Sequence, residues 1–185
     1  LVGGLVVYLT LLLSIAVNNN WNSDFAKIIL WAGVVFFIGL LDDLKQVSWP
    51  IRLFVQVSAI TGVIFSTGVE ITYLGTYPVI GAVQLGLFSL PFTILAVTGL
   101  TNSFNLIDGI DGLCGGLLLI PVISLILISG GQSHEFDYNL LVVLITLGIF
   151  LAFNLTGNAK THIFMGDAGS AGVGFIVSFL IINQF

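Results

Sequence analysis

Long apolar runs separated by short polar breaks dominate this sequence. Seven runs can be delimited, at residues 1–17, 26–41, 51–68, 90–105, 113–130, 138–154 and 169–185. A bilayer-spanning helix needs roughly 20 mainly apolar residues, and about 17 to 25 are tolerated. Strands of a membrane β-barrel would alternate apolar and polar residues, whereas the stretch GGLLLIPVISLILIS is apolar on every side. The pattern therefore predicts an all-α polytopic membrane protein with about seven transmembrane helices.

Composition agrees with this prediction. The chain of 185 residues is 57% hydrophobic and only 7% charged, with a mean hydropathy of +1.16, which lies far outside the usual composition of soluble domains. We find no repeat, low-complexity tract or long linker, so residues 1–185 are expected to form one transmembrane domain. Both ends fall within apolar runs, and we expect an internal piece of a longer protein, incomplete at both termini.

One segment between the runs has a different character. Residues 69–89 combine Gly and Pro with alternating β-branched or aromatic residues, a pattern typical of strands joined by a turn. It predicts a short β-hairpin outside the membrane.

Positive charge indicates which side of the membrane each loop occupies. If seven spans alternate, the loops at 42–50, 105–112 and 155–168 share one side. Lys45, Arg52 and Lys160 fall on that side, and only Lys27 on the other. Because Lys and Arg are enriched in cytoplasmic loops, this side is expected to be cytoplasmic.

Five of the nine acidic residues lie in the loops of the expected cytoplasmic side or at their edges: Asp42, Asp43, Asp108, Asp111 and Asp167. In a helical register, Asn105, Asp108 and Asp111 would lie within about 120° of arc, and Gly109 and Gly112 favour a turn instead. In either conformation, the carboxylates of Asp108 and Asp111 are expected to lie close to the amide of Asn105. For Asp42 and Asp43 taken alone, solvated loop charge is an equally good interpretation. The return of three acidic motifs to one side favours a common site.

Clustered carboxylates repel one another unless a cation neutralises them. Carboxylate oxygens suit Mg²⁺, with Mn²⁺ as an alternative, and Mg²⁺ commonly uses one or two carboxylates together with substrate phosphates. Lys45, Arg52 and Lys160 beside the metal would hold a phosphate-bearing substrate. The sequence thus predicts magnesium-dependent chemistry on a phosphorylated substrate.

Two other classes of membrane protein use intramembrane acids. A magnesium transporter or channel would place them near the membrane centre, whereas these acids lie at span ends. An intramembrane aspartyl protease, suggested by MGDAG, requires a second aspartate within a span, which the sequence lacks.

Four motifs resemble a known family. In order and spacing, LVGGLVVY, GLLDDLKQVSWPIR, TNSFNLIDGIDGLCGG and FMGDAGSAGVGF are similar to the polyprenyl-phosphate N-acetylhexosamine-1-phosphate transferases. The similarity is greatest to members that place GlcNAc-1-phosphate on undecaprenyl phosphate, and phospho-MurNAc-pentapeptide translocase is a more distant relative.

The resemblance implies a role for each motif. Asp42 and Asp43 match the first acidic pair of the family, on the side of the lipid phosphate. The motif formed by Asn105, Asp108 and Asp111 matches the nucleotide side. Asp167 matches the magnesium ligand, and Phe164 the aromatic residue that stacks on uracil.

The implied enzyme transfers an N-acetylhexosamine-1-phosphate, with GlcNAc-1-phosphate favoured, from a UDP-sugar to undecaprenyl phosphate and releases UMP. This would be the first membrane step of a cell-envelope polysaccharide such as lipopolysaccharide. The expected location is the bacterial inner membrane, with the active site facing the cytoplasm. The expected partners are the UDP-amino sugar, the polyprenyl phosphate and the bilayer. A homodimer is allowed, and no nucleic-acid partner is expected.

Overall fold

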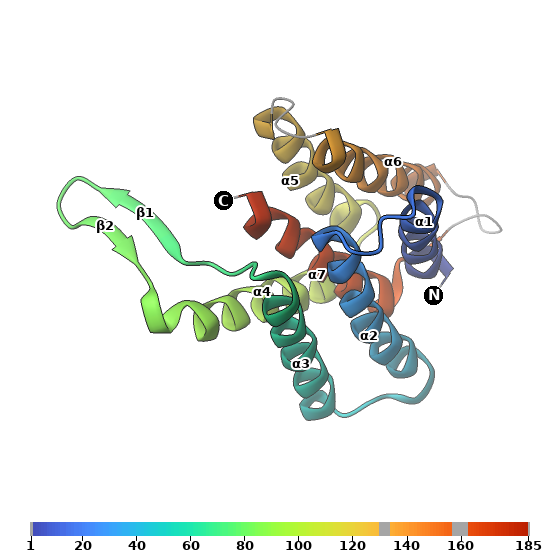
Figure 1. Ribbon diagram of the computed structural model, residues 1–185. Coiled ribbons are helices and arrows are strands. Elements are labelled where there is room, and N and C mark those ends of the chain that lie inside the picture. The colour runs from blue at the N-terminus through green and yellow to red at the C-terminus, as the bar shows by residue number, and fades with distance from the viewer. Residues whose placement is uncertain (1, 130–133, 157–162, 185) are drawn as a thin grey trace.

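The computed structural model describes residues 2–129, 134–156 and 163–184, and the side chains of Val2 and residues 134–137 are not described. Within these residues, seven α-helices, one short 3₁₀ helix and two strands follow one another (Figure 1). They are α1 (Val2–Asn18), α2 (Asp24–Lys45), α3 (Trp49–Thr67), β1 (Tyr73–Tyr77), β2 (Gly81–Gln84), η1 (Gly86–Phe88), α4 (Ser89–Ile107), α5 (Leu113–Ser129), α6 (His134–Thr156) and α7 (Gly166–Gln184).

Each of the seven predicted spans corresponds to one helix. Five helical segments of the described chain are long and apolar enough to cross a membrane: α2, α3, η1 with α4, α6 and α7. The other two helices, α1 and α5, are apolar and have 17 residues each, the lower end of the spanning range. The prediction of an all-α polytopic membrane protein is confirmed.

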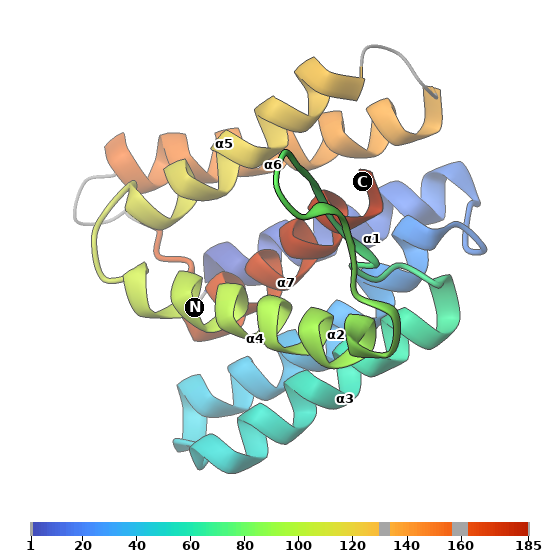
Figure 2. The same cartoon turned by 90° about the vertical axis from the view of Figure 1, so that its left-hand side faces the viewer.

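Helix α7 forms the centre of the bundle. Every residue from Ala168 to Leu180 is buried, because α1, α2, α4 and α5 all pack against this helix (Figures 1 and 2). Small residues permit this close packing. A Cβ added at Gly4 of α1 would lie 2.2 Å from Cα of Gly169, and one added at Gly39 of α2 would lie 2.5 Å from Cα of Ala168. Backbones can approach this closely only where side chains are absent or very short.

The hairpin predicted at 69–89 is confirmed. Strands β1 and β2 pair antiparallel, with Tyr77 opposite Gly81, and the hairpin projects sideways from the helices (Figure 1). Side chains of α4 hold its base. Ser89 Oγ donates a hydrogen bond to the carbonyl of Ile71 at 2.7 Å, and the backbone N–H of Ile71 donates to Thr93 Oγ1 at 2.9 Å.

The loop at 46–48 between α2 and α3 is short for clear local reasons. Gln46 ends α2 in a left-handed conformation, at φ 50°, and its N–H donates to the carbonyl of Asp42. Ser48 then precedes α3, with Pro50 in its first turn, where the missing N–H of proline costs nothing. The loop, the turn after α4 and the start of α7 all lie at the left-hand end of the bundle in Figure 2.

Candidate functional site

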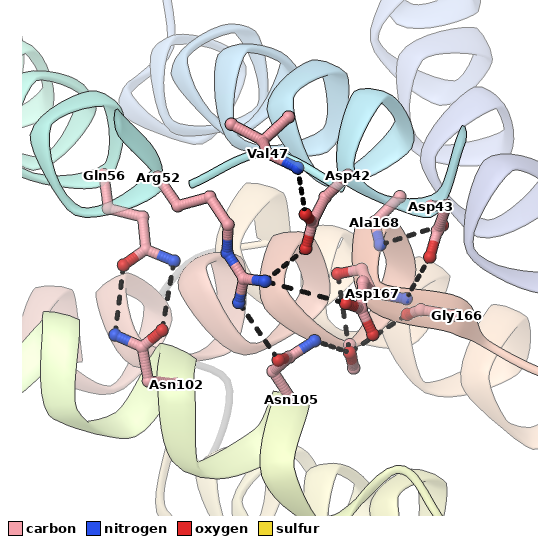
Figure 3. A network of polar contacts seen from close by, with 11 residues as sticks. Asp42, Asp43, Val47, Arg52, Gln56, Asn102, Asn105, Gly166, Asp167 and Ala168 are labelled. Atoms are coloured by element: carbon pink, nitrogen blue, oxygen red, sulfur yellow. Dashed lines mark hydrogen bonds and ion pairs between the residues drawn. The ribbon is translucent and has the colours of Figure 1, made fainter. Parts of the chain in front are cut away.

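Arg52 connects three of the sequence motifs at this end of the bundle. Its Nη1 forms an ion pair with Asp42 Oδ2 and lies 3.8 Å from Asp167 Oδ2. Its Nη2 donates a hydrogen bond to Asn105 Oδ1 at 3.3 Å. The guanidinium therefore brings together α2, α3, α4 and α7 (Figure 3). Because Arg presents several N–H groups in a fixed planar fork, one side chain can hold all of these positions.

Asp42 is oriented from two directions. Its Oδ1 accepts a hydrogen bond from the backbone N–H of Val47 at 2.7 Å, and its Oδ2 accepts from Arg52. The side chain is only 10% exposed, compared with 27% for Arg52. This partial burial makes the pair stronger than a solvated surface ion pair, so the interpretation of Asp42 as solvated loop charge does not hold.

Asp43 points to a different partner, the N-terminus of α7. Its Oδ1 accepts from the backbone N–H of Asp167 at 3.2 Å, and its Oδ2 from that of Ala168 at 3.4 Å. The first N–H groups of a helix have no partner within the helix and carry partial positive charge. Asp43 thus caps α7 from another helix and fixes the backbone of Asp167. Gly166 precedes Asp167 at φ 74°, a turn conformation that favours glycine.

Asn105 links α4 to the first turn of α7. Its Nδ2 donates to Ser170 Oγ at 3.2 Å, and Ser170 Oγ donates back to the carbonyl of Gly166 at 3.0 Å. With Oδ1 accepting from Arg52, both ends of the Asn105 amide are used. The amide therefore holds the guanidinium and the Asp167 turn in a fixed relation.

Asp108 lies just beyond the end of α4, where the chain turns rather than continuing as a helix. The pKa of its carboxyl is raised to about 6, mainly by burial; a backbone hydrogen bond from Gly166 opposes this rise, and the negative charges of Asp167 and Asp43 add to it. The negative charges of Asp43, Asp108 and Asp167 therefore interact at this point. Asp111 occupies the same turn and is exposed, and Gly112 ends the turn at φ 76°.

Asn154, near the C-terminal end of α6, is buried, at 6% exposure, and connects two loops of the site. Its Oδ1 accepts from the N–H of Gly112 at 2.6 Å, and its Nδ2 donates to the carbonyl of Ile163 at 2.9 Å. The turn carrying Asp108 and the segment leading to Asp167 thus share one anchor. An asparagine within an apolar helix was the available sequence signal.

The predicted residues fall into three groups by position. Hydrogen bonds, ion pairs or charge interactions join Asp42, Asp43, Arg52, Asn105, Asp108 and Asp167. Exposed residues at the same end are Lys45, in the last turn of α2, Asp111, in the turn after α4, and Phe164, two residues before α7. Lys160 lies outside the described residues.

The donor set of the site consists of carboxylate and amide oxygens. Within the described ranges, no three His, Cys, Asp or Glu side chains are grouped closely enough to enclose a metal ion. Carboxylate oxygens are the ligand type that Mg²⁺ prefers, and Mg²⁺ commonly uses one or two of them together with water and substrate phosphates.

Comparison with known proteins gives a consistent picture. The family model described as "Glycosyl transferase family 4" matches residues 25–184. The "Probable undecaprenyl-phosphate N-acetylglucosaminyl 1-phosphate transferase" of Bacillus subtilis (strain 168) is 32% identical over 181 residues, which cover 96% of this chain and 49% of the relative. The "Undecaprenyl-phosphate alpha-N-acetylglucosaminyl 1-phosphate transferase" of Escherichia coli (strain K12) is 32% identical over 188 residues, which cover 99% and 50%. The protein of the same name from Yersinia pestis is 32% identical over 186 residues, which cover 99% and 51%. The chain spans about half the length of the curated relatives it matches.

Proposed function

Because the chain belongs to glycosyl transferase family 4, we propose that it carries the acidic part of the active site of a polyprenyl-phosphate sugar-1-phosphate transferase. The donor would be a UDP-N-acetylhexosamine, with UDP-GlcNAc favoured, and the acceptor undecaprenyl phosphate. The relatives are named for transfer to undecaprenyl phosphate. The single observation that carries the proposal is the set of contacts made by the Arg52 guanidinium. It joins Asp42, Asn105 and Asp167, which belong to three motifs far apart in the sequence.

In the proposed reaction, an oxygen of the lipid phosphate attacks the β-phosphorus of the UDP-sugar. The bond from that phosphorus to the bridging oxygen breaks, and UMP leaves with the bridging oxygen. Such phosphoryl transfers depend mainly on positioning and charge neutralisation. The second pKa of a phosphate monoester lies near 6, so the lipid phosphate is already largely dianionic at neutral pH. Its attacking oxygen therefore needs little activation by a base.

Asp167 would hold Mg²⁺, with Asp108 as a second carboxylate. When bound, the ion would neutralise charge between the two phosphate-bearing substrates and on the leaving UMP. The partial burial of Asp108 and its charge interactions with Asp167 and Asp43 support this assignment, because neighbouring carboxylates repel one another unless a cation neutralises them.

The remaining side chains would bind and orient the substrates. Arg52 would donate hydrogen bonds to phosphate oxygens next to Asp42. Lys45 and Lys160 would add positive charge, and Phe164, 56% exposed, would stack on uracil. Asp111 would contribute to the nucleotide side. Asp42 would orient the acceptor phosphate, and Asp43 would maintain the start of α7 against which the phosphates lie. The site end would face the cytoplasm of the bacterium.

The test is to incubate the full-length protein containing this chain with several UDP-amino sugars and undecaprenyl phosphate, with Mg²⁺ or with a chelator. We expect a sugar-pyrophosphate lipid in the mass spectrum and an equal amount of UMP, both lost with the chelator. Magnesium flux into vesicles without nucleotide, and no lipid product with any donor, would instead support a transporter.

A further inference from the structure

A second polar contact joins α3 and α4 one helical turn deeper in the bundle than Arg52. Gln56 Nε2 donates to Asn102 Oδ1 at 3.4 Å, and Asn102 Nδ2 donates to Gln56 Oε1 at 3.1 Å. Asn102 Nδ2 also donates to the carbonyl of Thr98 at 2.9 Å. The two amides therefore face each other as a reciprocal pair (Figure 3). Gln56 is only 3% exposed.

The spacing along each helix aligns this pair with the site. Gln56 follows Arg52 by four residues on α3, and Asn102 precedes Asn105 by three on α4. Residues three or four apart lie on the same face of a helix. The bond from Arg52 to Asn105 and the amide pair are thus two successive contacts between the same two helix faces.

Burial along α3 shows why the second contact matters to the first. The buried residues of this helix are Gln56, Ala59, Ile60, Val63 and Ile64. Arg52 lies before all of them. The first turn of α3 is exposed, with Trp49 at 74% and Ile51 at 52%. Gln56 is therefore the buried anchor nearest to Arg52, and the guanidinium extends from a helix end that has little other packing.

We propose that the Gln56–Asn102 amide pair is a positioning element that fixes the rotation and height of α3 against α4, and so holds the Arg52 guanidinium between Asp42 and Asn105. Neither amide would touch the substrate. An apolar contact of similar shape would fill the space but would not define one register. The two amides, in contrast, must face each other, because a buried amide without a hydrogen-bond partner is costly. The consequence for turnover rests on the proposed function, whereas the position of Arg52 does not.

The first experiment measures Arg52 directly and requires no substrate. The full-length protein in native membranes is treated with phenylglyoxal, which reacts with accessible guanidinium groups, and the peptide containing Arg52 is quantified by mass spectrometry. Modification should be several-fold faster in Gln56→Leu and in Gln56→Leu/Asn102→Leu than in the wild type. The double variant leaves no unpaired amide, so it guards against misfolding of the single one. Ser58→Leu is the matched control, because Ser58 is exposed on the same helix and its hydroxyl donates to the carbonyl of Phe54 in that helix.

The second experiment asks whether the pair acts on turnover through Arg52. We expect Gln56→Leu to lower kcat/KM by roughly tenfold in the wild type and to have almost no further effect in an Arg52→Ala background, the non-additivity shown by residues that act together. The exchanged variant Gln56→Asn/Asn102→Gln should recover part of the loss.

The outcomes separate the two proposals. An unchanged rate of Arg52 modification in both leucine variants would overturn the positioning role, and so would equal losses of turnover in the wild-type and Arg52→Ala backgrounds. Faster modification in a protein that makes no lipid product with any UDP-sugar would support the positioning role and reject the proposed transferase function.

Discussion

The side chain of Asp43 accepts a hydrogen bond from the backbone N–H of Asp167 at 3.2 Å, across 124 residues of sequence. An acidic residue of the first acidic motif thus orients the backbone of Asp167, the acidic residue of the last motif. Its neighbour Asp42 faces Arg52 instead. Two adjacent carboxylates therefore have different tasks, and their substitution should have different effects.

Asp43→Ala should destabilise the bundle by about 1 kcal/mol, the usual cost of losing a side chain that caps a helix N-terminus. Asp43→Asn should cost less, because one amide oxygen can still accept from a backbone N–H. Unfolding in detergent with increasing denaturant measures both. Equal stability of Asp43→Ala and the wild type would show that these two hydrogen bonds contribute nothing to the fold.

Asp167→Asn should reduce metal-dependent turnover by about two orders of magnitude or more, since charge stabilisation by a bound metal ion is worth several kcal/mol. The amide keeps the size of the side chain, so insertion and folding should be normal. Rates measured over a range of Mg²⁺ concentrations provide the check, with Asp24→Asn at the opposite end of α2 as the control. Near-normal activity of Asp167→Asn at ordinary Mg²⁺ would remove this residue from the metal role.

Arg52→Lys should raise the KM for the nucleotide sugar by about tenfold, because one charge-assisted hydrogen bond is worth roughly 1.5–3 kcal/mol. Arg52 reaches Asp42 and Asn105 through different nitrogen atoms, and a single ammonium group cannot occupy both positions. Initial rates at varied donor concentration give the KM. If lysine restores wild-type kinetics, positive charge alone suffices and the forked contact is unimportant.

Asn154→Leu should leave the N–H of Gly112 and the carbonyl of Ile163 without their partner, at about 1–3 kcal/mol for each buried group left unsatisfied. Turnover should fall as well, because both loops carry site residues. Asn154→Asp is the informative companion, since it keeps the acceptor for Gly112 and loses the donor to Ile163. Thermal denaturation and turnover should rank the wild type first, the aspartate variant second and the leucine variant last.

Single cysteines at positions 108 and 70 should react with a membrane-impermeant maleimide from opposite sides of the membrane. Asp108 follows α4 at the site end, whereas Glu70 lies between α3 and the hairpin at the other end. Labelling of intact cells and of inverted vesicles, in a cysteine-free background, makes the comparison. Reaction of both positions from the same side would contradict the alternating arrangement of the helices.

Hydropathy predicted the helices well because the membrane imposes one strong requirement, the satisfaction of backbone hydrogen bonds within each span. The hairpin at 69–89 could be recognised because its turn residues interrupt that pattern. We predicted that Asp42, Asp108 and Asp167 lie at one end of the bundle by assigning alternate loops to opposite sides of the membrane. Each of these inferences depends on local composition or on the alternation of loops between the two sides of the membrane. Both can be read from a single sequence.

The division of labour between Asp42 and Asp43 could not be predicted in this way. It depends on the direction in which two successive side chains leave the last turn of α2, and on α7 lying beside that turn. The contact of Gln56 with Asn102 and the two bonds of Asn154 are likewise pairings across 46 residues or between two loops. Sequence spacing fixes a face of one helix, but the partner face is set only when the helices meet.

The central place of α7 has a consequence for how the protein is made. Of the seven helices described, α7 leaves the ribosome last, yet α1, α2, α4 and α5 all pack against it. During synthesis these four helices enter the membrane before their common partner exists, and their small and polar contact residues, such as Gly4, Gly39 and Asn105, face lipid or one another. Final assembly must therefore follow the insertion of α7.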